Sequence, residues 1–290
     1  MIMSTGGTGF LSLEQRAEVV TEHRDGAAPK PALWRSLVGN VSVRETAATV
    51  IVVVLLIFAM DVASWYVPDY IMPSPVAVLQ AILRLADTDY THVFITLTRL
   101  GVALAFSLVA GVLLGLVMGI SPLLRPFIRA LVIIDTGIPA LSWILLAVFW
   151  FKNPETRIFF ILIMILVPFY TLSVYDGIRA LPKDWIDMIE SFRPSQSQTL
   201  RYLIMPHIVP YILMTTKSVI GYATRMVIFA ELVASAVGVG SRMGLAQSTF
   251  HIDEVLAWTF FLIVLNIALQ LLVTGVEKLA LSWRPKAEVR

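Results

Sequence analysis

The 290-residue sequence contains no cysteine, which excludes a disulfide framework and thiol chemistry. It lacks a glycine-rich phosphate loop of the Walker type, so this chain is not expected to bind ATP in that way itself. No serine stands in a Gly-x-Ser-x-Gly elbow, and the scattered histidines, His23, His92, His207 and His251, show no zinc-ligand spacing. We therefore expect the chain to be no enzyme, to hold no metal or cofactor, and to have no nucleic-acid partner.

Charge is also scarce: 14% of the residues are charged and 58% are hydrophobic, with a mean hydropathy of +0.81. Several apolar runs are long enough, at about 20 residues, to span a bilayer as helices. Transmembrane strands would alternate, whereas Thr49 to Met60 and Ile158 to Phe169 are apolar on every side. The sequence predicts an all-α, polytopic membrane protein with about six transmembrane helices.

The six predicted spans divide the chain into three parts. The spans are Ala47 to Val67, Val93 to Ile120, Phe127 to Phe151, Ile158 to Tyr175, Ile208 to Val237 and Val255 to Leu279. A transmembrane domain (residues 47–279) with a polar loop at 179–207 thus lies between an N-terminal tail (1–46) and a C-terminal tail (280–290). An even number of spans places both tails on the same side of the membrane.

Lysine and arginine predict that side, because short cytoplasmic loops are enriched in them. One face carries Arg16, Arg24, Lys30, Arg35, Arg44, Arg125, Arg129, Arg179, Lys183, Arg193, Arg201, Lys278, Arg284, Lys286 and Arg290. The other face has only Arg84, Lys152, Arg157 and Arg242, with Arg99 nearer the outer end of the second span. Both termini and the polar loop are predicted to be cytoplasmic, in a multi-pass protein of the inner membrane.

The N-terminal tail is polar, and the first apolar run begins only at Ala47 without a small-residue cleavage site. We expect the first span to act as its own anchor. Leu33, Trp34, Leu37 and Val38 would form one face of a short helix on the membrane surface. An ordinary juxtamembrane linker explains the same residues equally well.

Small residues and prolines predict how the spans pack. Gly111, Gly115 and Gly119 recur at four-residue intervals, and such a stripe lets another helix approach closely, more often within a chain than between chains. Pro139 and Pro168 interrupt the third and fourth spans. These kinks would be passive, which is the commoner case, or would serve as gates beside a pathway.

Charges inside the spans are costly and are expected to face the bundle interior or a water-filled cavity. They are Asp135, Lys217, Arg225 and Glu231, whereas Arg99 would snorkel to the outer interface. On an ideal helix Lys217, Arg225 and Glu231 fall on one polar stripe. Asp135 would pair with Arg225 or Lys217. Arg225 would face a pathway and attract an anionic solute, or it would form a structural ion pair.

The polar loop carries a family resemblance. The segment from Asp187 to Arg193, followed after nine more residues by Leu203-Ile204-Met205-Pro206, resembles the cytoplasmic signature of binding-protein-dependent ABC importer permeases. The spacing of the family signature is kept, while several of its residues differ in this sequence. Other segments, over roughly residues 68 to 283, agree in order with the nitrate/sulfonate/taurine group: Met72-Pro73-Ser74-Pro75, Pro139-Ala140-Leu141, Phe149-Trp150-Phe151, Ala230-Glu231 and Gly238-Val239-Gly240.

The resemblance implies that the loop folds as two short helices, a coupling helix, which inserts into a groove of a separate ATP-binding subunit. Asp184 would favour the start of the first helix, and Pro194 would suit the first turn of the second. The coupling residues implied in this way are Asp187, Glu190, Ser191, Phe192, Arg193, Pro194, Leu200, Leu203 and Pro206.

Arg193 stands where the family has glycine, as though the chain takes a positive φ there or approaches another backbone closely. Because Pro194 favours extended geometry at the residue before it, we expect a corner built differently rather than a strained one. The arginine would contact an acidic ATPase surface, mark a divergent partner in a heterodimeric pair, or simply be solvated.

The resemblance implies the membrane-spanning subunit of an ATP-driven importer. Two copies, or two related chains, would form the pathway among membrane lipids, and each would couple to an ATPase subunit that binds ATP and Mg. A periplasmic or lipid-anchored solute-binding protein would dock on the outer loops, residues 68–92 and 238–254, and deliver a small anionic solute.

Two alternatives stay open. One is a self-sufficient secondary transporter or channel, although no inverted repeat is visible. The other is a membrane scaffold or sensor that binds an ATPase without transport. Loss of uptake on depleting ATP, with the ion gradient maintained, would separate an ATP-driven importer from a secondary transporter.

Overall fold

A computed structural model describes residues 41–281, and within them every regular element is a helix. The predicted all-α fold is therefore confirmed. In chain order the elements are α3 (Val41–Ser64), α4 (Pro75–Thr88), α5 (Tyr90–Ile120), α6 (Arg125–Gly137), α7 (Ala140–Trp150), α8 (Pro154–Arg179), α9 (Lys183–Ser191), α10 (Gln196–Thr199), the π-helical η1 (Leu200–Ile204), α11 (Met205–Ala234), α12 (Val239–Ser248) and α13 (Ile252–Ala280). The predicted surface helix near Trp34 and the C-terminal tail beyond residue 281 lie outside the described residues.

Five helices are long and apolar enough to cross a membrane, and a bent pair, α6 and α7, raises the number to six. The described residues divide into two units between Phe58 and Ala59. The helix α3 runs across this division, and its segment Ala47–Ser64 is the first of the five. The prediction of about six spans is confirmed, although α3 begins at Val41, six residues before the predicted start of the first span at Ala47.

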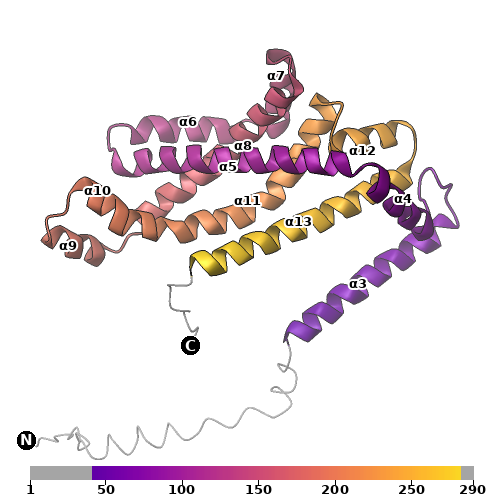
Figure 1. Cartoon of the computed structure of the whole chain (residues 1–290), viewed down its shortest axis with the longest axis horizontal. Coiled ribbons are helices and arrows are strands. Elements are labelled where there is room, and N and C mark those ends of the chain that lie inside the picture. The colour runs from indigo at the N-terminus through magenta and orange to yellow at the C-terminus, as the bar shows by residue number, and fades with distance from the viewer. Residues whose placement is uncertain (1–40, 282–290) are drawn as a thin grey trace, which may run out of the picture. The chain divides into compact units, whose positions relative to one another are not determined.

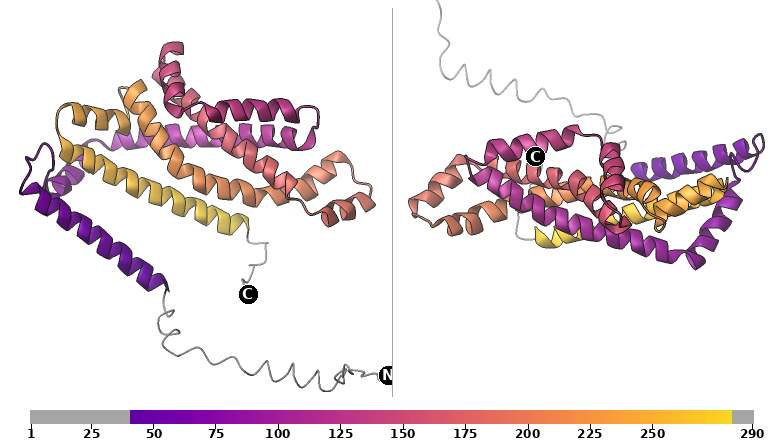
Figure 2. Two further views of the ribbon diagram at one scale, coloured as in Figure 1. Left: turned by 180° about the vertical axis from the view of Figure 1, so that it is seen from behind. Right: turned by 90° about the horizontal axis from the view of Figure 1, so that it is seen from above.

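The third predicted span is broken rather than kinked, which corrects the sequence-based expectation. α6 ends at Gly137, α7 begins at Ala140, and the two helices are bent by 94° (Figure 2). Ile138 has an extended ψ of 123°, because the ring of Pro139 disfavours helical geometry in the residue before it. Pro139 then precedes the first residue of α7. Pro168, in contrast, lies inside the continuous helix α8.

In the second unit, α5 packs along α8, and the glycine stripe forms this contact. A Cβ added to Gly111 would lie 2.9 Å from the carbonyl oxygen of Val167, and one added to Gly115 would lie 2.7 Å from Cβ of Val174. A Cβ on Gly119 would overlap Ile178. The stripe thus places the backbones of two helices of the same chain close together.

The two ends of this bundle carry different short helices. α9 and α10 lie at one end, and α4 and α12 lie at the other (Figure 1). α4 and α12 fall inside segments that the sequence analysis treated as loops. Ser74 caps α4 through its side chain, which accepts a hydrogen bond from the Ala77 N–H, and Pro75 occupies the first turn.

Candidate coupling corner and buried charge sites

The first candidate site is the corner formed by α9, α10 and η1 between the long helices α8 and α11. Trp185, Met188 and Phe192 follow one another at helical spacing and lie on one side of this arm. Their exposed fractions are 49%, 59% and 80%. Large exposed apolar side chains on a short helix with several charged neighbours form a surface suited to protein contact.

The second arm of the corner starts at a capping box. The Ser195 side chain accepts a hydrogen bond from the Gln198 N–H, and Gln198 Oε1 accepts one from the Ser195 N–H at 2.8 Å. Ser195 is therefore the N-cap of α10. Pro194 lies before the cap and not in the first turn, which corrects the expected position.

η1 joins α10 to α11 without a break in the helical path. The Met205 N–H donates to the carbonyl of Leu200, five residues earlier, and Pro206 follows with no N–H to donate. Leu200, Leu203 and Pro206 are half-buried here. The other implied coupling residues on the first arm, Asp187, Glu190, Ser191, Phe192 and Arg193, are exposed, and Pro194 is half-buried.

Arg193 adopts a left-handed backbone conformation with φ of 48°. Its N–H donates to the carbonyl of Glu190 at 2.9 Å, so the chain leaves α9 through a tight turn. The expectation that Pro194 would impose an extended corner is wrong. The family glycine indicated the correct geometry, and this chain adopts it with an arginine.

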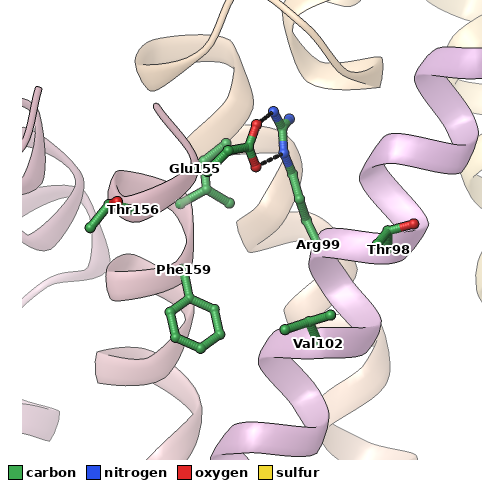
Figure 3. A pocket seen from close by; sticks show the side chains of 7 residues that line it. Thr98, Arg99, Val102, Glu155, Thr156 and Phe159 are labelled. Carbon is green, nitrogen blue, oxygen red and sulfur yellow. Dashed lines mark hydrogen bonds and ion pairs between the residues drawn. The ribbon is translucent and has the colours of Figure 1, made fainter. Parts of the chain in front are cut away.

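The second candidate site is a buried charge cluster at the α12 end of the bundle. Arg99 of α5 forms ion pairs with Glu155 of α8 and with Glu231 of α11, the latter at 2.8 Å. Figure 3 shows the Arg99 and Glu155 side chains facing each other above Val102 and Phe159. The Arg99 side chain is only 8% exposed, because the two carboxylates surround its guanidinium.

Glu231 is fully buried in the bundle interior, which is one of the two places expected for a charge inside a span. Its carboxylate accepts hydrogen bonds from the Thr96 hydroxyl at 2.8 Å and from the Gly240 N–H at 3.0 Å. Gly238, with φ of 121°, passes directly over this carboxylate, where any side chain would collide with it. Thr96 was not predicted as a site residue, because its role depends on this long-range contact.

The remaining charges predicted for the spans are separated. Lys217 of α11 pairs with Glu277 of α13, and Asp135 of α6 has a buried Oδ1 without a hydrogen-bond partner among residues 41–281. The expected pairing of Asp135 with Lys217 or Arg225 is therefore wrong. Arg225 is exposed and lines a pocket between α11 and α13. Among the described residues, no group of three carboxylate or imidazole side chains could hold a metal ion.

Comparison with known families accounts for this architecture. Residues 107–280 match the family described as "Binding-protein-dependent transport system inner membrane component". The chain belongs to this family. It is accordingly a multi-pass inner-membrane transport component. The family model covers the α9–α10 corner as well as α8, α11 and all of α13.

Curated relatives place this family member in the nitrate/sulfonate/taurine group, as the segments outside the loop predicted. It is 26% identical over 225 residues to the taurine transport system permease protein TauC of Escherichia coli. The alignment covers 75% of this chain and 82% of that protein. It is 23% identical to the nitrate import permease protein NrtB of Synechocystis, over 74% of this chain and 82% of that protein. Both are permease subunits.

Solved structures share the fold of this permease. The inward-facing MetNI methionine ABC transporter aligns with a TM-score of 0.54 at 15% identity, over 66% of this chain and 95% of that chain. An amino acid ABC transporter with histidines aligns with a TM-score of 0.56 at 15% identity, over 69% of this chain and 97% of that chain. The fold class of ABC importer permeases is thereby confirmed.

Proposed function

We propose that this permease is the pathway-forming subunit of an ATP-driven importer and docks a separate ATPase at the α9–α10 corner. The observation that carries the proposal is the exposed apolar surface of Trp185, Met188 and Phe192 on a short helix between two long ones. The apolar side chains of such a helix would keep the permease and its partner in contact while the two proteins move.

The corner is built to transmit motion into the bundle. α8 leads into α9 through a three-residue connection, and α10, η1 and α11 continue as one helical segment, Gln196–Ala234. A displacement of the corner would therefore be carried along this unbroken helical segment into α11. ATP and Mg would be bound by the partner ATPase, which would hydrolyse the ATP. This chain would change conformation without catalysing a reaction.

The remaining partners follow from the same family. A second permease chain would complete the pathway, and a solute-binding protein would dock at the α4 and α12 end. The α9–α10 end, with both termini, would face the cytoplasm according to the basic residues of the loops. We infer a small anionic solute, supported by relatives whose names specify nitrate and bicarbonate transport.

A pull-down from gentle detergent tests the ATPase contact. The tagged native chain is compared with a variant in which Trp185, Met188 and Phe192 are changed to Asp. Leu200 is left unchanged because it is half-buried and its replacement would disturb the fold. We expect an ATP-hydrolysing subunit to copurify with the native chain and to be lost from the variant.

The matched control changes exposed apolar residues at the other end of the bundle, Leu245 and Phe250, to Asp. This control should retain the ATPase. If the native chain retains no ATPase, the result rejects the ATP-driven importer and favours a self-sufficient secondary transporter. If all three chains retain it equally, the α9 surface is not the docking site.

A further inference from the structure

The pocket between α11 and α13 has an unusual balance of hydrogen-bonding groups. It has a volume of about 310 Å³, and its polar lining residues are Thr224 and Arg225 of α11 with Thr259 and Asn266 of α13. The remaining walls are apolar apart from Gly221, and no acidic residue lines the pocket. A cation within a membrane-spanning helix is stabilised by a negatively charged partner, and the residues that line this pocket supply none for Arg225.

The donors in this pocket outnumber the acceptors. Arg225 makes no ion pair or hydrogen bond within residues 41–281, although its guanidinium carries five N–H donors. The amide oxygen of Asn266 accepts a bond from Gln270 Nε2 at 3.5 Å, which leaves the Asn266 amide N–H groups available. Thr224 and Thr259 donate their hydroxyl hydrogens to carbonyls of their own helices.

The depth of Arg225 distinguishes a transported anion from a lipid headgroup. Arg225 precedes the end of α11 at Ala234 by nine residues, which places it about 13 Å along the helix from that end. A phosphate headgroup lies outside the hydrocarbon core, which is about 30 Å thick. This position favours a free anion over a headgroup as the ligand, and anionic lipid added in the test below separates the two.

Gly221 leaves room beside the donor group of α13. A Cβ added to Gly221 would lie 3.6 Å from Asn266 Oδ1, at ordinary contact distance, so a longer side chain there would fill the pocket. Lys217, one turn further along α11, is already paired with Glu277 and does not add a second free cation. The pocket therefore offers a single positive charge and a neighbouring amide.

We propose that Arg225 and Asn266 form a binding site for a small, singly charged oxyanion inside the permease. The proposal rests on the proposed importer function and specifies where the solute is held on its way. A guanidinium with an adjacent amide matches the planar or tetrahedral oxygens of nitrate, bicarbonate or a sulfonate. The apolar walls limit the size of the group that accompanies those oxygens.

The test measures binding of nitrate, bicarbonate and ethanesulfonate to the purified complex in nanodiscs of zwitterionic lipid, without a binding protein. We expect at least one probe to bind the native complex, and Arg225→Gln to weaken that binding about tenfold or more. Arg225→Lys should lose less, because it keeps the charge. Arg129→Gln, which removes an exposed arginine from α6, is the matched control and should bind as the native complex does.

Four results would overturn the oxyanion site. They are binding of no probe by the native complex, unchanged binding by Arg225→Gln, competition from anionic lipid added to the nanodiscs, and a weaker association of two permease copies in Arg225→Gln with unchanged probe affinity. The last two would assign Arg225 to a headgroup or to an ion pair between chains. ATPase copurification should persist in Arg225→Gln, so failure of this site is distinguishable from failure of the proposed coupling.

Discussion

Nη1 of Arg99 donates a hydrogen bond to Oε1 of Glu231 at 2.8 Å, and this pair joins α5 to α11 with the Glu231 side chain fully buried. Thr96 and the Gly240 N–H complete the shell of the same carboxylate, so α12 is tied to both helices through one buried charge. Removing one member of a buried pair leaves an uncompensated charge, which costs more than the pair itself contributes. The ion pair between Arg99 and Glu231 therefore holds α5, α11 and α12 together at this end of the bundle.

Replacing Arg99 with Gln should lower the free energy of unfolding by about 3–5 kcal/mol, because Glu231 would stay buried without its cation. Glu155→Gln removes the other partner of Arg99, but Glu155 is 62% exposed, so this control should cost about 1 kcal/mol or less. Unfolding of the purified protein in detergent, followed by tryptophan fluorescence, gives both values. Equal losses in the two variants would show that the burial of Glu231 is not decisive.

A double-mutant cycle isolates the contact itself. Arg99→Gln with Glu231→Gln should cost clearly less than the sum of the two single changes, because each single change leaves one buried group without its partner. The measurement is the free energy of unfolding of the native protein, the two single variants and the double variant under one set of conditions. Additive losses would mean that the two residues stabilise the fold independently.

Arg193→Gly should raise the free energy of unfolding by about 1–2 kcal/mol, because a left-handed residue with a side chain costs roughly that much relative to glycine. Arg193→Ala loses the same charge but keeps a Cβ at φ of 48°, so it should give no such gain. Comparing the two in the same unfolding assay separates backbone strain from charge. A gain in both variants would place the effect in the charge instead.

Gly115→Ala should destabilise the contact between α5 and α8 by about 1–3 kcal/mol, since the added Cβ would lie 2.7 Å from Cβ of Val174. Gly101→Ala, on the same helix, meets nothing within 4 Å and should be neutral or slightly stabilising, because alanine favours the helix. Melting temperatures of the two variants provide the comparison. Equal shifts would mean that the stripe does not set the distance between these helices.

How much of this structure could be predicted differs from element to element. The long spans followed from apolar runs alone, because only a helix satisfies its own backbone in lipid. Pro139 marked the break between α6 and α7, but the 94° bend depends on the packing of both helices and has no local signal. The helix α4 was missed even though Ser74 followed by Pro75 is a common helix start.

The candidate sites show the same division. The spacing of the loop signature correctly located the corner between α8 and α11, and the family glycine at position 193 indicated its positive φ. The position of Glu231 could not be obtained from helical periodicity, because the N-terminus of α12 folds back over it. Pairwise partners such as Glu277 for Lys217 depend on which helices meet, and a single sequence does not specify this.

The absence of cysteine permits a direct test of membrane orientation, since each introduced thiol is the only one in the chain. Ser197 of α10 and Ser248 of α12 are exposed at opposite ends of the bundle, and Cys at either position should be tolerated. In intact spheroplasts a membrane-impermeant maleimide should label Ser248→Cys and not Ser197→Cys, because the basic loops are retained in the cytoplasm. Inverted vesicles should give the reverse pattern. Labelling of Ser197→Cys from outside would place the α9–α10 corner beyond the reach of a cytoplasmic ATPase and would contradict the proposed coupling.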